Sequence, residues 1–555
     1  MKQQIRQLVK GSVRRAIQAA ALAEQRLPKV EIEVPKNEIH GDYSTNIAMV
    51  MASSQKKAPR IIAEQIIDHL EDHDNLITKT EIAGPGFINF FINIASWQKV
   101  LRDIQNAGDD YGRNDMGNGA KFQIEFVSSN PTGPLHVGHG RGAAVGDSVG
   151  NILQFSGYDV QKEYYINDAG RQIETLGLSV FLRYQSLLGK QIDFPEDCYQ
   201  GGYIQDIARI VQEKHAHDLD DMPEDTAIAY CARIAAAQII KGIRRDLEAF
   251  GVNFDRWFSE QSLYDSGSVD QVITELQERN IVYEKDGATW FRTSEYQDEK
   301  DRVIVRKNGQ KTYFASDVAY HLDKYRRGFE KVIDVWGADH HGYIPRMTAS
   351  IEALGYRRDQ FEVILVQLVN LLRGGEPVAM STRAGEFITL KDVVEEVGTD
   401  AARFLFLTRH YESPLDFDLE LAKKKTNENP VYYVQYVHAR IASILNKGKE
   451  RGVINEKADQ DIVLDCLGET EEIQLIKTLG QFPEVVRKSA NFREPHRVTY
   501  YLMSLASAFH SYYNKHRVLA DDPVLVQARL YLVMAVQTII RLGLTLLGVS
   551  APEKM

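Results

Sequence analysis

The chain has 555 residues, a length that accommodates three or four domains. Its 44% hydrophobic and 26% charged residues are typical of a soluble globular protein. The net charge of −11 argues against a protein that coats nucleic acid without specificity, because that mode needs a broad positive field, but it leaves open an RNA partner recognised by shape.

Neither a disulfide framework nor a metal site is expected, because the cysteines lie far apart. They are Cys198, Cys231 and Cys466. The basic N-terminus is not followed by an uninterrupted apolar segment, which argues against a signal peptide. The most apolar stretch, residues 525–549, contains Arg529 and Arg541, and we interpret it as too polar to span a membrane. We expect a cytoplasmic protein without a membrane partner.

The first part of the chain predicts an α+β domain over residues 1–115. Apolar positions recur at helical spacing over residues 5–27, with basic residues between them, which predicts an amphipathic helix. Its basic face is either solvated or turned towards RNA. A strand-like alternation follows at residues 30–35. Further helices are expected up to residue 54 and over 59–70, strand structure within 82–92, and a linker at 108–119.

From residue 121 the pattern becomes strand, loop and helix in turn. Such alternation, with near-continuous apolar strands, predicts an α/β fold with a doubly wound, parallel, Rossmann-like sheet over residues 116–398. An insertion is expected at about residues 169–300, helical at first. The expected strands are 122–127, 160–166, 331–336 and 361–368, with helices up to 155 and over 344–354, and short strands in or near the insertion at 288–292, 302–306 and 311–314.

After residue 400 no strand pattern remains. Residues 399–428 are expected to connect the α/β domain to a C-terminal α-helical bundle over 429–555. Helices of the bundle are expected from residue 432 and over 498–513 and 523–547.

His136 and His139 stand three residues apart at the expected start of a helix, among glycines that let a ligand approach the backbone. Three interpretations are open. The pair could bind a metal, although the motif lacks an acidic general base and a third ligand. It could simply cap and pack the helix start. It could also donate hydrogen bonds to a phosphate whose charge changes during a reaction.

The segment Pro134-Leu-His-Val-Gly-His-Gly140 is similar to the HIGH signature of class I aminoacyl-tRNA synthetases, and its context over residues 125–147 resembles arginyl-tRNA synthetases of the bacterial type. The resemblance spans nearly the whole chain. It continues, in order, through residues 164–172, 336–346, 427–440 and 547–555. It implies a ligase that activates arginine with ATP, releases pyrophosphate and transfers arginine to the 3′ end of its tRNA, commonly with tRNA required for activation.

The resemblance also implies which residues contact ATP. They are His136 and His139 at the phosphates, Gly138 and Gly140 at the adenosine, Asp339 and His341 near ribose and adenine, and Met380. A helix cap is the alternative for Asp339. We expect Mg²⁺ to accompany ATP, and no zinc.

The second signature of the family, the KMSKS loop, corresponds to residues 379–383. Both lysines are missing, since Ala379 and Thr382 stand in their places. Gly133 stands where some relatives carry a compensating lysine. A lost cation facing the phosphates removes on the order of several kcal/mol of transition-state stabilisation. We expect Ser381 and Arg383 to act as catalytic residues at the pyrophosphate, with an activity below that of the family.

The arginine pocket of the family maps onto Glu125, Ser128, Asn130, Tyr313 and Asp317. A carboxylate matches the planar fork of a guanidinium bidentately, whereas an ammonium offers no such fork. Glu125 follows an apolar strand, and Tyr313 and Asp317 are four residues apart, on one side of a strand end or a helix start. A helix cap is the alternative for Asp317, and a solvated strand end is the alternative for Glu125.

The positions that match tRNA-binding residues of the family are Phe87 and Asn89 in the first domain and Tyr436, Arg440, Tyr513 and Met555 in the bundle. Aromatic stacking and amide hydrogen bonds are physically suited to RNA recognition. Phe87 could instead belong to the core of a strand. Arg517 stands where some relatives carry an aromatic residue.

Two other functions remain open at this stage. One is a different nucleotidyl transferase on the same fold, although such chemistry needs neither the first domain nor the helical bundle. The other is an inactive paralogue retained for RNA binding or regulation, supported only by the altered loop. The expected partners are arginine, ATP and the tRNA for arginine, and the chain is expected to act as a monomer.

Overall fold

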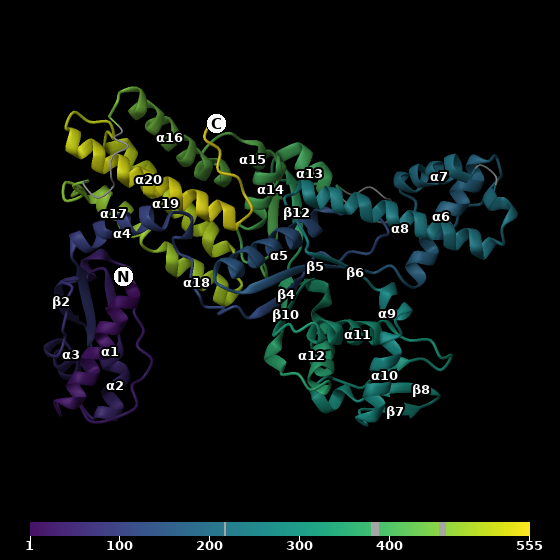
Figure 1. Ribbon diagram of the computed structural model, residues 1–555, viewed down its shortest axis with the longest axis horizontal. Coiled ribbons are helices and arrows are strands. Elements are labelled where there is room, and N and C mark those ends of the chain that lie inside the picture. The colour runs from purple at the N-terminus through teal and green to yellow at the C-terminus, as the bar shows by residue number, and fades with distance from the viewer. Residues whose placement is uncertain (216–217, 379–387, 454–461) are drawn as a thin grey trace. The chain divides into compact units, whose positions relative to one another are not determined.

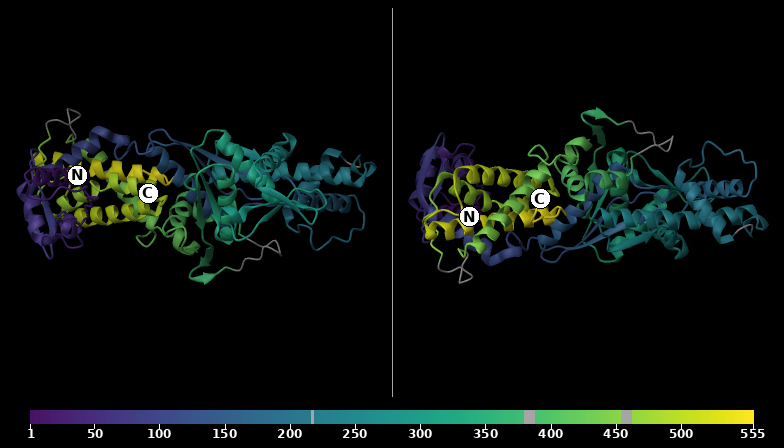
Figure 2. Two further views of the ribbon diagram at one scale, coloured as in Figure 1. Left: turned by 90° about the horizontal axis from the view of Figure 1, so that it is seen from below. Right: turned by 90° about the horizontal axis from the view of Figure 1, so that it is seen from above.

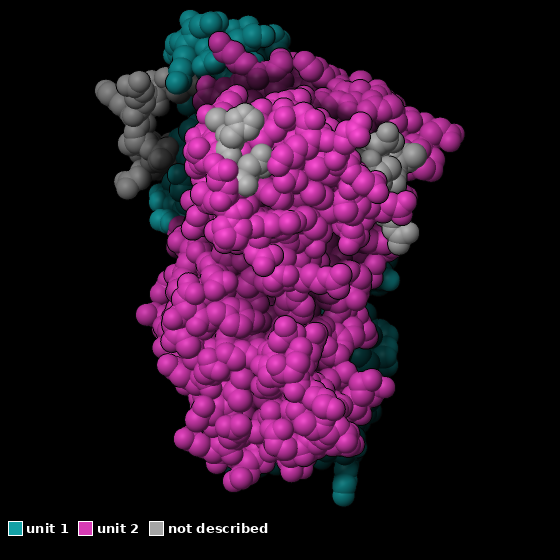
Figure 3. Space-filling model, turned by 90° about the vertical axis from the view of Figure 1, so that its right-hand side faces the viewer, with its two compact units in different colours: residues 1–111, 441–482, 507–539 teal, residues 112–440, 483–506, 540–555 magenta. Residues whose placement is uncertain are grey.

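The computed structural model describes residues 1–215, 218–378, 388–453 and 462–555. Its internal contacts divide the chain into two compact units, which Figure 3 colours separately. The first comprises Met1–Tyr111, Ile441–Phe482 and Ser507–Ile539, and the second comprises Gly112–Arg440, Pro483–Ala506 and Ile540–Met555. The helices near the C-terminus therefore contribute residues to both units.

An antiparallel sheet, in the order β1-β3-β2, forms the N-terminal part of the first unit. Its strands and flanking helices are α1 (Lys2–Gln18), β1 (Tyr43–Thr45), α2 (Ile47–Gln55), α3 (Pro59–Asp68), β2 (Ile77–Ala83), β3 (Phe87–Ile92) and α4 (Ile94–Ala107). Helix α1 is shorter than predicted because Ala20 adopts a left-handed conformation with φ of 56°. The strand predicted at residues 30–35 is reduced to one bridge between Glu33 and Ser44.

Five parallel strands form the central sheet of the second unit, in the order β11-β10-β4-β5-β6. They are β4 (Lys121–Glu125), β5 (Asp159–Ile166), β6 (Arg256–Ser259), β10 (Lys331–Gly337) and β11 (Phe361–Val366). This confirms the predicted doubly wound fold. The strand order reverses between β4 and β10, and ligands of such sheets bind at the carboxyl ends of the strands beside the reversal.

Helices α5 (Val137–Phe155) and α11 (Tyr313–Arg326) cover opposite faces of this sheet (Figure 1). Asp147 of α5 forms an ion pair with Lys162 of β5 at 2.6 Å, whereas Lys324 of α11 forms one with Glu125 of β4 at 2.6 Å. Ile124 pairs with Lys162 in the ladder, and neighbouring residues of a strand point to opposite faces. The two helices therefore sandwich the sheet.

A helical arm formed by α6 (Arg171–Leu187), α7 (Gly202–His215) and α8 (Glu224–Ala249) projects from the sheet (Figures 1 and 2). Strand β6 follows α8 and lies inside the range predicted as an insertion, yet it pairs in parallel with β5. The sequence pattern missed β6 because a strand of four residues is too short to show a period.

A small antiparallel sheet follows, in the order β7-β8-β9, with strands Val282–Lys285, Ala288–Phe291 and Arg302–Val305. The strand predicted at residues 311–314 is wrong. Lys311 makes only one bridge, to Val305, and Tyr313 already begins α11. Nearby helices are α9 (Gln261–Asp265), α10 (Ser268–Glu278) and α12 (Ile344–Ala353).

A third small sheet has the strand order β13-β12-β14. Strands β12 and β13 precede residues 379–387 in the chain, and β14 follows them after two helices. Its strands are β12 (Val369–Arg373), β13 (Glu376–Pro377) and β14 (Leu415–Asp418), and its neighbouring helices are α13 (Leu390–Val397), α14 (Thr399–Phe406) and α15 (Leu419–Lys423). The expectation that no strand follows residue 400 is wrong, because β14 pairs in parallel with β12.

The described residues that follow α15 form helices joined by loops, as predicted. The helices are α16 (Pro430–Glu450), α17 (Thr470–Leu479), α18 (Phe482–Phe492), α19 (His496–Lys515) and α20 (Pro523–Leu546). By length and composition α20 is apolar enough to cross a membrane, contrary to our interpretation of its arginines, but 61% of its apolar window is buried within the protein. Arg529 finds a partner there, since its Nε donates to Glu472 at 2.8 Å. A helix in the core of a protein can be equally long and apolar, so these properties of α20 are weak evidence for a membrane span.

The end of the chain is built into the second unit. Arg403 of α14 is fully buried, and its Nε donates to the carbonyl of Leu547 at 3.0 Å. It also donates to the carbonyl of Phe250 at 3.2 Å and forms an ion pair with Asp147 of α5. Three elements distant in sequence are thereby joined through one side chain.

Candidate active site

The turn from β4 into α5 is strained. Val127 and Ser128 both adopt left-handed conformations, with φ of 69° and 40°. Such a conformation is unfavourable for a β-branched residue and persists only where the surrounding structure imposes it. The Ser128 hydroxyl accepts a hydrogen bond from the backbone N–H of Tyr165 at 3.2 Å, which ties the turn to the end of β5. Strain of this kind is common at ligand-binding sites.

His136 and His139 cap the N-terminus of α5 reciprocally. Nδ1 of His136 accepts from the Gly138 N–H at 3.1 Å, and Nδ1 of His139 accepts from the His136 N–H at 3.2 Å. The two rings are stacked, with centroids 3.7 Å apart. The capping interpretation is therefore correct for Nδ1. It does not exclude the phosphate interpretation, which concerns the other ring nitrogen.

The capping bonds decide which nitrogen carries the proton. A neutral imidazole that accepts at Nδ1 bears its proton on Nε2 and can donate there. Burial lowers the pKa of His136, and burial together with His136 lowers the pKa of His139 to about 3. Both rings are thus neutral near pH 7, and each offers one Nε2–H donor beside the positive end of a helix dipole.

The chain returns to this turn immediately after the altered loop. Thr389 forms an antiparallel bridge with His136, and the Leu390 N–H donates to the Leu135 carbonyl at 2.8 Å. On the other side, the N–H groups of Gly374 and Gly375 donate to Asp418 at 3.0 and 2.8 Å. Ala379, Met380, Ser381, Thr382 and Arg383 lie outside the described residues. The described chain resumes at residue 388, and its Thr389 lies beside His136.

Arg373 does not take the place of a missing lysine. Its guanidinium binds both carboxylate oxygens of Glu396, at 2.6 and 2.9 Å, and contacts Glu420 at 3.1 Å. A guanidinium engaged by two carboxylates is not available to pyrophosphate.

The space beside Gly138 and Gly140, the two glycines of the motif, and beside Gly133 just before it is occupied by the protein. A Cβ at Gly140 would lie 2.7 Å from Leu390, and one at Gly138 would lie 2.9 Å from the ring of His136. A side chain at either position would therefore clash with the protein itself, so glycine is required there for packing. At Gly133 a Cβ would lie 3.2 Å from the Tyr203 hydroxyl, which donates to the Thr132 carbonyl at 2.6 Å.

Gly133→Lys is therefore not expected to restore a phosphate-binding cation. The new side chain would meet Tyr203, so the exchange rate of ATP with pyrophosphate should not rise, and stability should fall by about 1 kcal/mol. The double variant Gly133→Lys, Tyr203→Ala removes the obstacle. Exchange rates of the two variants, measured with arginine and tRNA present, check this. A faster single variant would contradict the steric role of Tyr203.

Glu125 is buried and already has a cationic partner. Lys324, which is fully buried, donates to Glu125 at 2.6 Å and to Asp334 at 2.9 Å. His321 Nε2 lies 2.9 Å from the other oxygen of Asp334. Lys324 was not among the candidate residues inferred from the sequence, although a lysine on the apolar face of a helix is a signal of a buried ion pair. The solvated alternative for Glu125 is wrong.

The side chain of Asn130 forms hydrogen bonds with two residues that follow β5. Its Oδ1 accepts from Asn167 at 2.9 Å, and its Nδ2 donates to Gln172 at 2.6 Å. Both ends of the amide are engaged, which fixes its orientation.

Asp317 and Tyr313 lie on one side of α11, at its first turns. Asp317 accepts a hydrogen bond from the hydroxyl of Tyr343, and burial raises the pKa of its carboxyl. Thr312, not Asp317, is the N-cap of α11, so the capping alternative is wrong. Tyr313 is 51% exposed, and its hydroxyl would lie 3.0 Å from a Cβ at Gly170. Asp317 is half-buried, whereas the ring of Tyr313 is accessible.

Asp339 and His341 are exposed at the carboxyl end of β10, the strand next to β4. Gly337 is the N-cap of the short helix that contains them, so Asp339 is not its cap. Both side chains thus lie at the edge of the sheet where a nucleotide would bind.

Phe87 and Asn89 share one face of β3, since they are two residues apart. Phe87 is 37% exposed, but Asn89 is 2% exposed and its buried Nδ2 has no hydrogen-bond partner. A buried amide offers RNA no surface in this conformation. The core alternative applies to Phe90, which is 1% exposed.

In α16 the guanidinium of Arg440 lies 4.9 Å from the ring centre of Tyr436. His438 Nδ1 is 2.9 Å from the Pro552 carbonyl, which ties the last residues to this helix, and Met555 is 54% exposed. Tyr513 belongs to the first unit, where its ring stacks on Phe509 at 5.8 Å.

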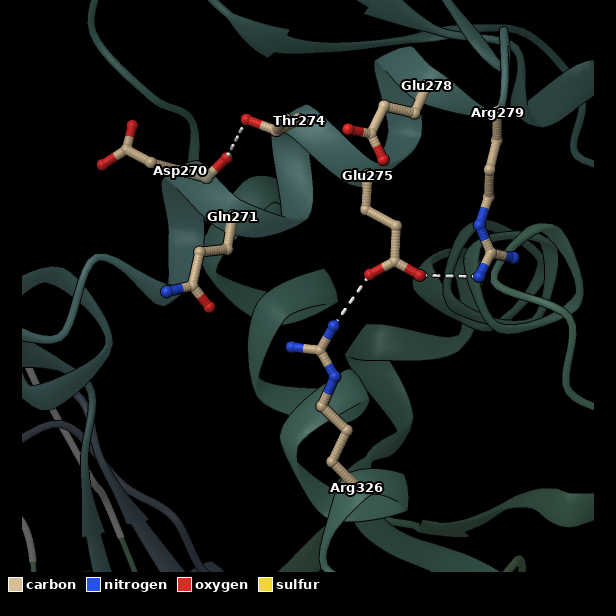
Figure 4. A pocket seen from close by; sticks show the side chains of 7 residues that line it. All are labelled: Asp270, Gln271, Thr274, Glu275, Glu278, Arg279 and Arg326. Atoms are coloured by element: carbon tan, nitrogen blue, oxygen red, sulfur yellow. Dashed lines mark hydrogen bonds and ion pairs between the residues drawn. The ribbon is translucent and has the colours of Figure 1, made fainter.

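A surface depression of about 660 Å³ lies along α10, away from these residues. Figure 4 shows that Glu275 pairs with Arg279 and Arg326, at 2.6 and 2.8 Å, so its central charges compensate one another. Among the residues that the structure describes, no group of three or more His, Cys, Asp or Glu side chains is arranged to hold a metal ion.

Three families match successive parts of the chain. Residues 4–92 match the arginyl tRNA synthetase N-terminal domain, residues 101–411 the catalytic domain of class I (R) tRNA synthetases, and residues 434–555 the DALR anticodon-binding domain. Arginine–tRNA ligases of Desulfosudis oleivorans and Syntrophotalea carbinolica are 58% and 55% identical to the chain, over the full length of both partners.

Solved structures agree with these matches. A structure described as a putative arginyl-tRNA synthetase of Campylobacter jejuni has a TM-score of 0.75 at 36% identity and covers 84% of the chain and all of its own. The arginyl-tRNA synthetase of Thermus thermophilus has a TM-score of 0.76 at 21% identity, over all of both chains, and supports the fold alone.

Proposed function

The chain belongs to the arginyl-tRNA synthetase family and has the activity of an arginine–tRNA ligase, and from this premise we propose which of its residues perform each step. The reaction joins the arginine carboxylate to the α-phosphate of ATP, releases pyrophosphate and passes arginine to the 3′ end of the tRNA. Chemistry of this kind depends on positioning and charge stabilisation. The pair of Nε2–H donors at the start of α5 is the observation that supports our assignment most strongly.

At the ATP site, His136 and His139 donate Nε2–H to the phosphates, and the backbone at Gly138 and Gly140 lies along the nucleotide. Asp339 and His341 serve ribose and adenine. We assign Met380, Ser381 and Arg383 to the nucleotide and pyrophosphate, because Thr389, six residues after Arg383, forms a bridge with His136.

We propose Mg²⁺ as a companion of ATP, and no zinc. Magnesium commonly keeps several waters and uses one or two carboxylates with substrate phosphates, which fits a site where Asp339 is an exposed acid at the carboxyl end of β10. Bound there, it would neutralise charge on the departing pyrophosphate.

The arginine site consists, in our assignment, of Glu125, Ser128, Asn130, Tyr313 and Asp317. Ser128 and Asn130 lie on the strained turn and suit the amino and carboxylate groups. Asp317 suits the guanidinium, because its carboxyl is buried beside a hydroxyl and not paired to a lysine.

For tRNA we assign Phe87, Tyr436, Arg440, Tyr513 and Met555. Asn89 requires a local opening before it could contact RNA, because its side chain is buried. We further propose domains over residues 1–115, 116–398 and 429–555 with a connection at 399–428, and a monomer that acts in the cytoplasm without a membrane partner.

The activity itself is tested by arginine-dependent exchange of pyrophosphate into ATP, measured with and without tRNA. We expect exchange with tRNA present. Absence of exchange under both conditions would contradict the enzymatic function and favour a protein retained for RNA binding.

Asp317→Asn is expected to raise the KM for arginine about 10- to 100-fold, because a hydrogen bond to a charged group is lost while the amide keeps the shape of the side chain. The KM for ATP should change less than twofold. Steady-state exchange kinetics with each substrate varied check this. Equal losses for both substrates would refute the assigned role.

A further inference from the structure

The first unit contains an ion pair between the N-terminal sheet and the helical bundle. Asp42 lies just before β1, where its backbone N–H donates to the carbonyl of Phe90 in β3 at 2.9 Å. Its Oδ2 accepts from the backbone N–H of Ile92, the last residue of β3, at 2.8 Å. Its Oδ1 pairs with the ammonium of Lys477 in α17 at 2.5 Å. One carboxylate thus joins two parts of the protein that are distant in sequence.

Helix α4, which follows β3 directly, packs beside the same helix α17 (Figure 1). The side chain of Gln98, 4% exposed, donates to the carbonyl of Leu467 at 3.1 Å. Arg102 donates to another carbonyl in the segment before α17 at 2.8 Å. At the far end of α17, a Cβ at Gly480 would lie 3.1 Å from the ring of Trp97. Helix α4 is therefore held at both ends of α17.

The N-terminal sheet passes into α4 through Asn93, which is the N-cap of the helix. Residues at the ends of elements commonly act as hinges between packed parts. The pair of Asp42 with Lys477 lies on the sheet side of this connection and reaches past α4 to α17. The adjacent ring of Tyr43 stacks on Trp97, with centroids 6.1 Å apart. These contacts brace the sheet against rotation about the connection.

The proposed tRNA contacts lie on both sides of this brace. Phe87 belongs to β3 of the sheet and Tyr513 to α19 of the bundle, and both lie in the first unit. Two contacts with one RNA molecule reinforce each other only when their spacing matches the ligand, because the second contact then forms at a high effective concentration. A loosened sheet would lose this gain although both contact surfaces remained.

We propose that Asp42 and Lys477 are positioning residues for tRNA, which hold the N-terminal sheet and the bundle at the spacing that lets both bind one tRNA molecule. The inference rests on the proposed tRNA contacts. The side chain of Asp42 is 8% exposed and that of Lys477 is 30% exposed. The carboxylate therefore acts through Lys477 and not by touching RNA.

Asp42→Asn separates this role from simple electrostatic attraction. Asparagine keeps an oxygen that accepts from the N–H of Ile92, so the fold should be retained, but it loses the charge that holds Lys477. If net charge alone mattered, removal of an acid would not weaken RNA binding. We expect the Kd for the full-length tRNA for arginine to rise about tenfold. The Kd for the isolated anticodon stem-loop, which offers only the anticodon contacts, should stay within twofold of wild type. Fluorescence anisotropy of labelled RNA measures both.

Steady-state kinetics supply a second readout. The KM for tRNA should rise about tenfold in Asp42→Asn. The KM values for arginine and ATP should stay within twofold, because the catalytic sheet lies in the other unit. Lys477→Met breaks the same pair from the other side and should give the same pattern. Lys477→Arg keeps a cation for Asp42 and should behave as wild type.

Asp74→Asn is the matched control, because Asp74 is an exposed acid of the first unit and the change of charge is the same. It should bind both RNAs as wild type does. Equal Kd values of Asp42→Asn and Asp74→Asn for full-length tRNA would overturn the proposal, and so would equal losses for full-length tRNA and stem-loop. If the variants do not fold, a wild type that binds full-length tRNA no more tightly than the stem-loop would overturn it independently. A wild type that binds neither RNA would instead refute the proposed function.

Discussion

Replacing Lys324 with methionine is expected to lower the free energy of unfolding by about 3–5 kcal/mol. The ammonium is fully buried and bridges Glu125 and Asp334 at 2.6 and 2.9 Å. Methionine fills a similar volume but leaves two buried carboxylates without a cation. Urea unfolding, followed by circular dichroism, measures the loss.

Lys311→Met provides the control, since Lys311 pairs with Asp270 at 2.6 Å while the Asp270 side chain is 67% exposed. Surface pairs contribute at most about 1 kcal/mol. A loss for Lys324→Met no greater than that for Lys311→Met would contradict the role of the buried bridge.

The cost of Lys324→Met should also depend on pH. In the wild type, Lys324 and His321 lower the pKa of Asp334 to about 2, below its ordinary 3.8, despite its burial. A lowered pKa stabilises the fold above the ordinary value, and this contribution is lost as the pH falls towards 2. The difference between variant and wild type should therefore be larger at pH 7 than at pH 3.

His136→Asn is expected to lower kcat for exchange about 10²- to 10³-fold, by analogy with the removal of a hydrogen-bond donor that stabilises transition-state charge. Asparagine is a favourable N-cap, so it keeps an acceptor for the first turn of α5 and removes only the Nε2–H donor. The melting temperature should change by no more than a few degrees.

His136→Ala separates the two roles, because alanine loses both the cap and the donor. It should show the same loss of kcat as His136→Asn with an additional stability loss of about 1 kcal/mol. If His136→Asn kept wild-type kcat, capping alone would account for the histidine. Arginine binding, measured by calorimetry, should be similar in both variants.

The long periodic elements could be predicted from the sequence, and the short ones could not. Six elements agree with the predictions because their hydrophobic patterns are long enough to be recognised. They are the strands β4, β5, β10 and β11 and the helices α5 and α12. Strands β6 and β14 have four residues each and are recognisable only by the neighbours with which they pair. Residues 311–314 are apolar enough for a strand, but tertiary contacts place Tyr313 in a helix.

The candidate site shows the same limit at the level of side chains. The motif around His136 could be identified from sequence, and so could its position at a helix start. The contact between Glu125 and Lys324 could not be identified from the sequence. Lys324 lies 199 residues further along the chain, and only the folded sheet and helix bring the two side chains together.

The position of Arg403 has a consequence for synthesis on the ribosome. Its guanidinium is fully buried and needs the carbonyl of Leu547, which belongs to the last ten residues of the chain. Until those residues emerge, Arg403 lacks this acceptor beside Asp147 of α5, and its guanidinium cannot be buried with all of its hydrogen bonds made. We therefore expect the packing around Asp147 to be completed only after Leu547 has been released, and a chain without its last ten residues to be less stable than the full chain.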